Sequence, residues 1–276
     1  MKKAILASVL LALTLVSYSQ RIITAGSAIT ETVCALGECG KIIASDKTSL
    51  YPAEIQKLPS IGYRSGISAE GIISLRPTLL IAEKEYVEAT VLTQIQSAGI
   101  KVMIIDRVYT LDGTRDLIRK IAAELNRSAE GDKIIRKIEG ELAEVQSTIK
   151  KSKVQPKVLC VYNRGASSVS AAGTHTFSEI LPLAGATSAV TGIEGYKPLN
   201  TEALMASNPD YILMFESGIQ SIGGVDGVLK IAGVGQTTAG KKKQIIAMDG
   251  IKLSNFGPRL GEAVKELVAQ FHPGVK

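Results

Sequence analysis

The chain has 276 residues, a formal net charge of +6 at pH 7, 45% hydrophobic residues and no tryptophan. This length suits two domains of ordinary size, each large enough to bury its own core. Basic residues are scattered, and the only tight run, residues 241–243, is typical of a solvated loop. The composition therefore argues against a nucleic-acid partner and is compatible with a small anionic ligand.

Residues 1–19 have the pattern of a secretory signal peptide. Lys2 and Lys3 precede an apolar run over residues 4–16, and small residues stand just before Gln20, where we expect cleavage. The run is too short to span a bilayer, and no later segment is long and apolar enough. Cleavage would lower the formal charge from +6 to +4, because it removes two lysines. We therefore expect a periplasmic protein that does not itself span the membrane.

Residues 20–126 are predicted to form a first α/β lobe. Short apolar strands alternate with short helices in this stretch, which indicates a mainly parallel sheet. Ser27 and Ser68 are expected to cap two of the helices, and Cys34 and Cys39 either form a disulfide or remain thiols. The expected strands cover residues 21–25, 42–44, 79–82 and 102–106, and the expected helices cover residues 28–36, 69–75 and 86–97.

A long amphipathic pattern lies at the middle of the chain. After a predicted helix over residues 111–125, apolar residues recur every three or four positions from Ser128 to Ser152, which predicts one helix roughly 36 Å long. Residues 127–153 are assigned as this connecting helix, which is stiffer than a Gly/Ser tether. The second lobe is expected over residues 154–276, with strands at 158–162, 212–214 and 244–248 and helices at 176–184, 225–231 and 259–271.

One short pattern occurs once in each half of the chain. Tyr63 and Tyr196 each follow a glycine, precede a basic residue and stand before a short predicted helix. Glu70 and Glu202, 132 positions apart, each stand seven residues before a proline. Similarity at so long a period indicates a duplicated lobe and not a solenoid. The predicted fold is α/β, with two similar lobes that have central, mainly parallel sheets and are joined by one long α-helix.

The sequence contains no motif of an enzyme nucleophile and no phosphate-binding loop. Its two histidines, His175 and His272, are too sparse for a catalytic triad or a hydrolytic metal site. We expect His175 in a surface turn and His272 in solvent. The protein is therefore predicted not to be an enzyme, and the alternative is an enzyme that uses Cys160 or His175.

Tyr63 is the sharpest candidate for a ligand-binding residue. It lies in the sequence GYRSG, where flanking glycines let a side chain project freely, and tyrosinate is a known axial ligand of haem iron. The positive charge of Arg64 would favour the phenolate. The alternative is that the ring packs on a lobe edge. For Tyr196, which precedes Lys197, packing and ligand contact are equally open.

Glu70 and Glu202 also have two interpretations. Each is a first-turn carboxylate that the helix dipole stabilises by about 0.3–1 kcal/mol. Their matched positions alternatively provide a two-point electrostatic dock for a basic partner that has twofold symmetry.

Four stretches carry a resemblance to a known family: ITAGSAITETVCALG, LPSIGYRSGISAEGIISLRP, GYKPLNTEAL and MDGIKLSNFGPRLGEAV. They resemble the cluster-A-III substrate-binding proteins of ABC importers, and among these the periplasmic haem-binding proteins of the HmuT type. The resemblance covers nearly all of residues 21–271. It implies a protein that captures haem between two lobes and delivers it to an inner-membrane ABC permease with its ATPase. A corrinoid or a ferric siderophore is the alternative ligand.

The resemblance also implies roles for single residues. Tyr63 would be the axial ligand of the haem iron, and Glu70 and Glu202 would dock on arginines of the permease. Relatives often have an arginine two residues after the tyrosine, whereas here Arg64 follows it directly.

The haem site is also predicted to include Asn163, Arg164, Tyr196 and Lys197. Some relatives supply a histidine from the loop after the first strand of the second lobe. Here that loop carries Asn163 and Arg164, so we expect no histidine ligand from it. The iron would then be five-coordinate, or Arg164 would cover its open face.

Overall fold

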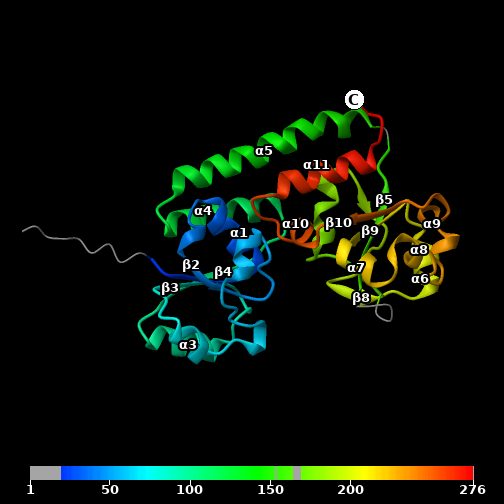
Figure 1. Ribbon diagram of the computed structural model, residues 1–276. Coiled ribbons are helices and arrows are strands. Elements are labelled where there is room, and N and C mark those ends of the chain that lie inside the picture. The colour runs from blue at the N-terminus through cyan, green and yellow to red at the C-terminus, as the bar shows by residue number, and fades with distance from the viewer. Residues whose placement is uncertain (1–19, 153, 164–168, 276) are drawn as a thin grey trace, which may run out of the picture.

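The computed structural model describes residues 20–152, 154–163 and 169–275, which form two lobes along one long helix (Figure 1). The predicted signal peptide lies outside the described residues. Each lobe has a central sheet with helices on its faces. The prediction of an α/β fold with two lobes is therefore confirmed.

The N-terminal lobe is built on a fully parallel sheet. Its strands are β1 (Ile22–Ala25), β2 (Ile42–Ser45), β3 (Leu79–Glu83) and β4 (Lys101–Ile105), and its helices are α1 (Ser27–Ala35), α2 (Ala69–Ser74), α3 (Ala89–Ser97) and α4 (Leu111–Glu124). The strand order is β2-β1-β3-β4. One face of the sheet packs against α1 and α4 and the other against α2 and α3. The strands are apolar runs because both faces are covered.

The C-terminal lobe has a mixed sheet. Its strands are β5 (Lys157–Asn163), β6 (Val169–Ala172), β7 (Thr187–Ser188), β8 (Tyr196–Pro198), β9 (Tyr211–Phe215) and β10 (Ile245–Met248). Its helices are α6 (Thr201–Ser207), α7 (Glu216–Ser221), α8 (Gly224–Leu229), α9 (Thr238–Lys242), α10 (Gly250–Ser254) and α11 (Leu260–Phe271). Strands β10, β9 and β5 run parallel, whereas β6 and β8 extend the sheet in antiparallel pairing. This antiparallel edge was not predicted.

Helix α5 (Ser128–Lys151) is the predicted long helix, and it runs along both lobes (Figure 1). Its buried side chains include Ile135, Ile138 and Leu142, which share one core with α11. The same helix packs against α4 of the other lobe. Because both lobes pack on it, α5 is a structural part of each lobe and not a free tether.

We predict that the lobes move little when ligand binds. A continuous apolar stripe resists bending unless a proline or a packing defect interrupts it, and only Gly131 and Gly140 weaken the stripe of α5. Small-angle X-ray scattering with and without ligand is expected to give nearly the same radius of gyration. A change of several ångströms would contradict a rigid connection.

The predicted helix over residues 176–184 is wrong. The chain instead forms two 3-10 turns, Phe177–Ile180 and Pro182–Ala184. Pro182 has no N–H group, so it cannot donate the hydrogen bond that would continue an α-helix from the first turn.

Two helix starts also differ from the prediction. Helix α1 begins at Ser27 after Gly26, so Ser27 is not its N-cap, and the Ser27 hydroxyl donates to Asn255 Oδ1 of the other lobe at 2.6 Å. Helix α3 begins at Ala89. Tyr86 therefore lies in the loop between β3 and α3, where it is 5% exposed.

His272 is buried, which corrects the expectation that it is solvated. Only 5% of it is exposed, and its ring nitrogens lie 2.8 Å from Ser152 Oγ and 3.2 Å from the Ala184 carbonyl oxygen. These contacts attach the end of α11 to the end of α5 and to the 3-10 turn Pro182–Ala184. Near the start of the chain, Cys34 and Cys39 form a disulfide across the end of α1, which decides between the two alternatives.

Candidate functional site

Tyr63 lies on a tight turn of the N-terminal lobe, just before the 3-10 turn Arg64–Gly66. Gly62 has φ +101°, and a Cβ there would meet the Gly66 carbonyl oxygen at 2.9 Å, so the turn requires glycine. The Gly62 carbonyl accepts a hydrogen bond from the Lys47 amide at 2.9 Å. The turn is thereby fixed while 42% of the Tyr63 side chain stays exposed.

The positively charged Arg64 side chain lies beside the Tyr63 oxygen. Arg64 Nε donates to Tyr63 Oη at 3.2 Å. Tyr86 meets the Tyr63 ring edge to face, with centroids 6.0 Å apart and planes at 88°. The phenol oxygen thus accepts a hydrogen bond from a guanidinium group, and the residue that carries it is exposed.

Tyr196 belongs to an aromatic wall in the C-terminal lobe, which we define as Tyr162, Phe177, Tyr196 and Phe215. The centroid of Tyr196 lies 5.0 Å from that of Tyr162, and those of Phe177 and Phe215 lie 4.7 Å apart. Loss of water raises the pKa of Tyr196 to about 12, with Tyr109 and Tyr162 adding to the shift, although 45% of the residue is exposed. Tyr196 thus stays a neutral phenol at pH 7.

A row of polar and aromatic side chains links Tyr63 to this wall. Glu83, at the end of β3, binds Arg107 at 2.8 Å, and the Arg107 guanidinium lies 5.5 Å from the centre of the Tyr109 ring. At one end of the row Tyr86, which contacts the Tyr63 ring, follows Glu83 by three residues, and at the other end Tyr109 packs on the same core as Tyr162 and Phe215 of the wall. Burial raises the pKa of Glu83 although Arg107 opposes the shift.

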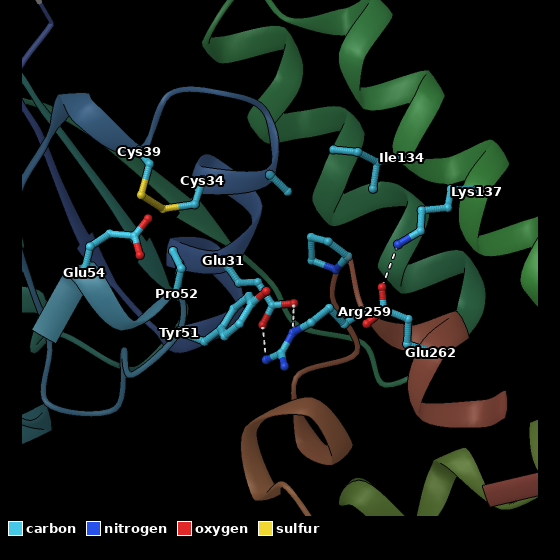
Figure 2. A pocket seen from close by; sticks show the side chains of 12 residues that line it. Glu31, Cys34, Cys39, Tyr51, Pro52, Glu54, Ile134, Lys137, Arg259 and Glu262 are labelled. Atoms are coloured by element: carbon cyan, nitrogen blue, oxygen red, sulfur yellow. Dashed lines mark hydrogen bonds and ion pairs between the residues drawn. A yellow bond between two sulfur atoms is a disulfide. The ribbon is translucent and has the colours of Figure 1, made fainter. Parts of the chain in front are cut away.

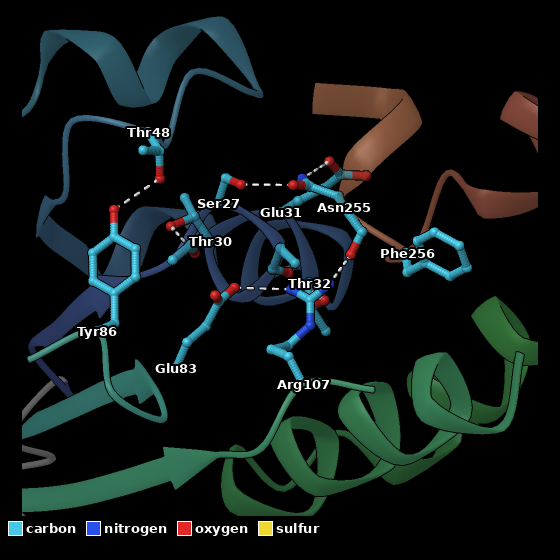
Figure 3. A network of polar contacts seen from close by, with 12 residues as sticks. Ser27, Thr30, Glu31, Thr32, Thr48, Glu83, Tyr86, Arg107, Asn255 and Phe256 are labelled. Carbon is cyan, nitrogen blue, oxygen red and sulfur yellow. Dashed lines mark hydrogen bonds and ion pairs between the residues drawn. The ribbon is translucent and has the colours of Figure 1, made fainter. Parts of the chain in front are cut away.

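This row follows the carboxyl ends of the parallel strands, which is where α/β sheets bind ligands. Arg107 also donates to the Asn255 carbonyl of the other lobe, so the row crosses the junction between lobes (Figure 3). Glu83, Arg107 and Tyr109 were not predicted as site residues. Glu83 and Arg107 directly follow the strands predicted over residues 79–82 and 102–106, which is a local signal for a site there.

The other predicted ligand contacts are less close to this row. Asn163, at the end of β5, is buried and donates to the Gly218 carbonyl at 3.0 Å and to Ser221 Oγ at 3.1 Å, so its amide lies against α7. Lys197 follows Tyr196 on β8 and is exposed. Arg164 lies outside the described residues.

Glu70 and Glu202 occupy equivalent places in the two lobes. Each is exposed and lies in the first turn of its helix, α2 or α6. Ser68 caps α2 as predicted, with Oγ accepting from the Gly71 amide at 3.1 Å, and Asn200 caps α6. Glu70 and Glu202 are therefore not the N-caps of their helices, and both residues are exposed to solvent.

The residues of the alternative enzyme lie in unfavourable places. Cys160 is fully buried, and burial raises the pKa of its thiol. His175 is exposed in a turn. Within the described ranges, no group of three or more His, Cys, Asp or Glu side chains is placed to hold a metal ion. Among the helices of the same ranges, none is long and apolar enough to cross a membrane.

A cavity of about 410 Å³ is lined by residues of both lobes and of α5 (Figure 2), and neither Tyr63 nor Tyr196 is among them. Four of its charged groups pair with one another: Arg259 binds both oxygens of Glu31 at 2.9 Å, and Lys137 binds Glu262 at 2.6 Å, whereas Glu54 also lines the cavity. Because both basic groups are already paired, the described residues that line the cavity leave no cation for an anionic ligand, and it is a weaker site for such a ligand than the row at Tyr63.

Comparison with known proteins places the chain among binding proteins. The family model described as periplasmic binding protein matches residues 22–251. The apo form of the periplasmic heme-binding protein RhuT from Roseiflexus sp. RS-1 superposes with a TM-score of 0.87 at 35% identity, over 94% of this chain and 100% of that chain. The periplasmic heme-binding protein BhuT in complex with two hemes has a TM-score of 0.87 at 32% identity, over 93% and 99%.

Similar sequences include two kinds of relative. The uncharacterized ABC transporter substrate-binding lipoprotein YvrC of Bacillus subtilis is 25% identical over 248 residues, which are 88% of this chain and 77% of that protein. The vitamin B12-binding protein of Salmonella typhimurium is 35% identical over 103 residues, 37% of this chain and 38% of that protein. The likeness to the heme-binding structures therefore extends much further along the chain than the likeness to this B12-binding protein.

Proposed function

The chain belongs to the periplasmic binding protein family, and we propose that it captures haem between its lobes and delivers it to an ABC importer. The observation that carries this proposal is the setting of Tyr63, an exposed phenol on a glycine-dependent turn with a guanidinium on its oxygen. Likeness to RhuT and BhuT over more than nine-tenths of the chain supports haem as the ligand.

The proposed site has a group for each part of haem. Tyr63 would bind the ferric iron through its oxygen. The aromatic wall around Tyr196 would contact the macrocycle, and Lys197 and Arg64 would attract the propionates. Asn163 and Arg164 are proposed as further contacts from the end of β5.

We also propose the division of the chain into a cleaved signal peptide (residues 1–19), an N-terminal lobe (20–126), a connecting helix (127–153) and a C-terminal lobe (154–276). The protein would act in the periplasm, with an inner-membrane permease and its ATPase as partners. It would have no catalytic residues, and haem would be its cargo and not a resident cofactor.

A titration with three ligands tests the choice of cargo. Haemin, cyanocobalamin and a ferric siderophore are added separately to the purified protein. We expect a Soret band that saturates with haemin, and no comparable binding of the other two. Tight binding of cyanocobalamin or of the siderophore, without saturable haemin binding, would replace haem with the alternative ligand.

Glu70 and Glu202 are proposed to act in delivery and not in haem binding. Exposed charges of this kind act mainly on the association rate and its salt dependence. Reversing both residues to Lys should leave the haemin titration unchanged but slow haem uptake into vesicles that contain the permease. The wild-type interaction should weaken with added salt, because the Debye length is only about 8–10 Å at moderate ionic strength.

The matched control reverses Glu88 and Asp226 to Lys. These exposed residues also stand at helix starts, one in each lobe, and produce the same change in net charge. Uptake with the control variant should equal that of the wild type. Equal uptake by both double variants would mean that Glu70 and Glu202 only stabilise their helices through the helix dipole. Loss of haem binding in the Glu70 and Glu202 variant would mean that these residues belong to the ligand site.

A further inference from the structure

Arg64, which donates to the Tyr63 oxygen, also contacts the ring of a second tyrosine, Tyr86. Its guanidinium carbon lies 5.1 Å from the centroid of the Tyr86 ring and 5.7 Å from that of Tyr63. A guanidinium over an aromatic face is attracted by the ring quadrupole. The Arg64 guanidinium thus lies beside both rings, although the residue belongs to an exposed turn.

Tyr86 is itself firmly anchored. It is 5% exposed, and its hydroxyl donates to the Asp46 carboxylate, which is 2% exposed and also accepts from the Gly26 amide at 3.0 Å and from Ser49 Oγ at 2.6 Å. The Tyr86 oxygen also lies 3.2 Å from Thr48 Oγ1 (Figure 3). A buried ring that its hydroxyl holds in place is a suitable platform for a cation.

We propose that Tyr86, anchored by Asp46, is a positioning residue that holds the Arg64 guanidinium on the Tyr63 oxygen and so sets how strongly this oxygen binds haem iron. The inference rests on the proposed function. Arginine has many rotamers, and the hydrogen bond to Tyr63 is directional, so a mobile Arg64 would interact with the ligand oxygen only part of the time. Tyr86 would act on the ligand through Arg64 and not by touching haem.

The ligand-free protein provides a first test, which does not depend on haem. The Arg64 Nε–H signal in ¹⁵N NMR should carry a ring-current shift from Tyr86. The shift should remain in Tyr86→Phe, which keeps the ring, and disappear in Tyr86→Leu. An unchanged signal in Tyr86→Leu would overturn the proposed contact whatever the ligand is.

A double-mutant cycle tests the effect on haem. Tyr86→Leu is expected to speed haem dissociation by about tenfold, within the 10–100-fold range for groups that orient metal ligands, and to shift the tyrosinate-to-iron charge-transfer band. In an Arg64→Gln background the same substitution should change the dissociation rate less than about twofold, because coupled residues are not additive. Additive effects would show that Tyr86 acts on general structure and would overturn the proposal.

Two further variants keep the test decisive if Tyr86→Leu is poorly folded. Tyr86→Phe keeps the ring but loses the bonds to Asp46 and Thr48, and it should speed dissociation to a smaller extent, with the charge-transfer band retained. Tyr211→Leu serves as a control for lost stability. It removes a partly buried tyrosine of the C-terminal lobe, which packs on Phe271 of the same lobe. A dissociation rate that rises equally in Tyr211→Leu would contradict a specific role of Tyr86.

Discussion

Replacing Tyr63 with Phe is expected to abolish the tyrosinate-to-iron charge-transfer band and to speed haem loss. The variant keeps the ring and its edge-to-face contact with Tyr86 but removes the oxygen that Arg64 now contacts. Even residues that only orient metal ligands are worth about 10–100-fold in affinity, so loss of the ligand itself should raise the dissociation rate by at least roughly 100-fold. Transfer of haem to a scavenging globin measures this rate.

Tyr196→Phe is the matched control for this experiment. The pKa of Tyr196 is raised to about 12, so its phenol is a poor anionic ligand at neutral pH, and its removal should leave the band in place. A charge-transfer band that is unchanged in Tyr63→Phe but lost in Tyr196→Phe would mean that the iron ligand is Tyr196, in the C-terminal lobe. A spectrum unchanged in both variants would make Tyr86 the next candidate, although it is buried.

Features that depend on local pattern could be predicted from the sequence. The buried parallel strands are apolar runs, and the 3- and 4-residue spacing of α5 defines a helix over nearly the predicted range. The antiparallel edge was not predictable in this way. Strand β8 is only three residues long, contains Pro198 and is exposed throughout, so its sequence carries neither an apolar run nor an alternating pattern.

In the candidate site, too, features that depend on local sequence could be predicted, and contacts between distant residues could not. Tyr63 could be singled out because glycine at position 62 is a local requirement of its turn. The contact between Arg107 and Asn255 joins residues 148 positions apart and depends on how the lobes meet, so no short stretch of sequence encodes it. Tyr86 was predicted to lie in a helix. Its place in the loop before α3 involves a hydrogen bond to the carboxylate of Asp46, which is distant in sequence and which the local pattern does not indicate.

The ion pair between the lobes leads to the second large effect, which is expected for Glu31→Gln. Glu31 on α1 is 3% exposed, and Arg259 before α11 binds both of its oxygens at 2.9 Å while it stacks 3.6 Å from the Tyr51 ring centroid. Asn255 Nδ2 donates to the same carboxylate at 3.1 Å. Gln keeps the size of the side chain but leaves the charge of Arg259, whose side chain is 13% exposed, without its anionic partner, which costs about 3 kcal/mol of unfolding free energy, the lower end of the range for a broken buried pair.

Urea unfolding of the ligand-free protein measures this loss, and Glu144→Gln is the control. Glu144 also pairs with a base of α11, Lys265, at 2.7 Å, but both side chains are substantially exposed, so little or no change is expected. Because α5 packs against both α4 and α11, both lobes depend on one helix, and the lost pair should lower the stability of the whole protein. Equal midpoints for the two variants would mean that water reaches Arg259 and that the junction between the lobes is looser than its hydrogen bonds indicate.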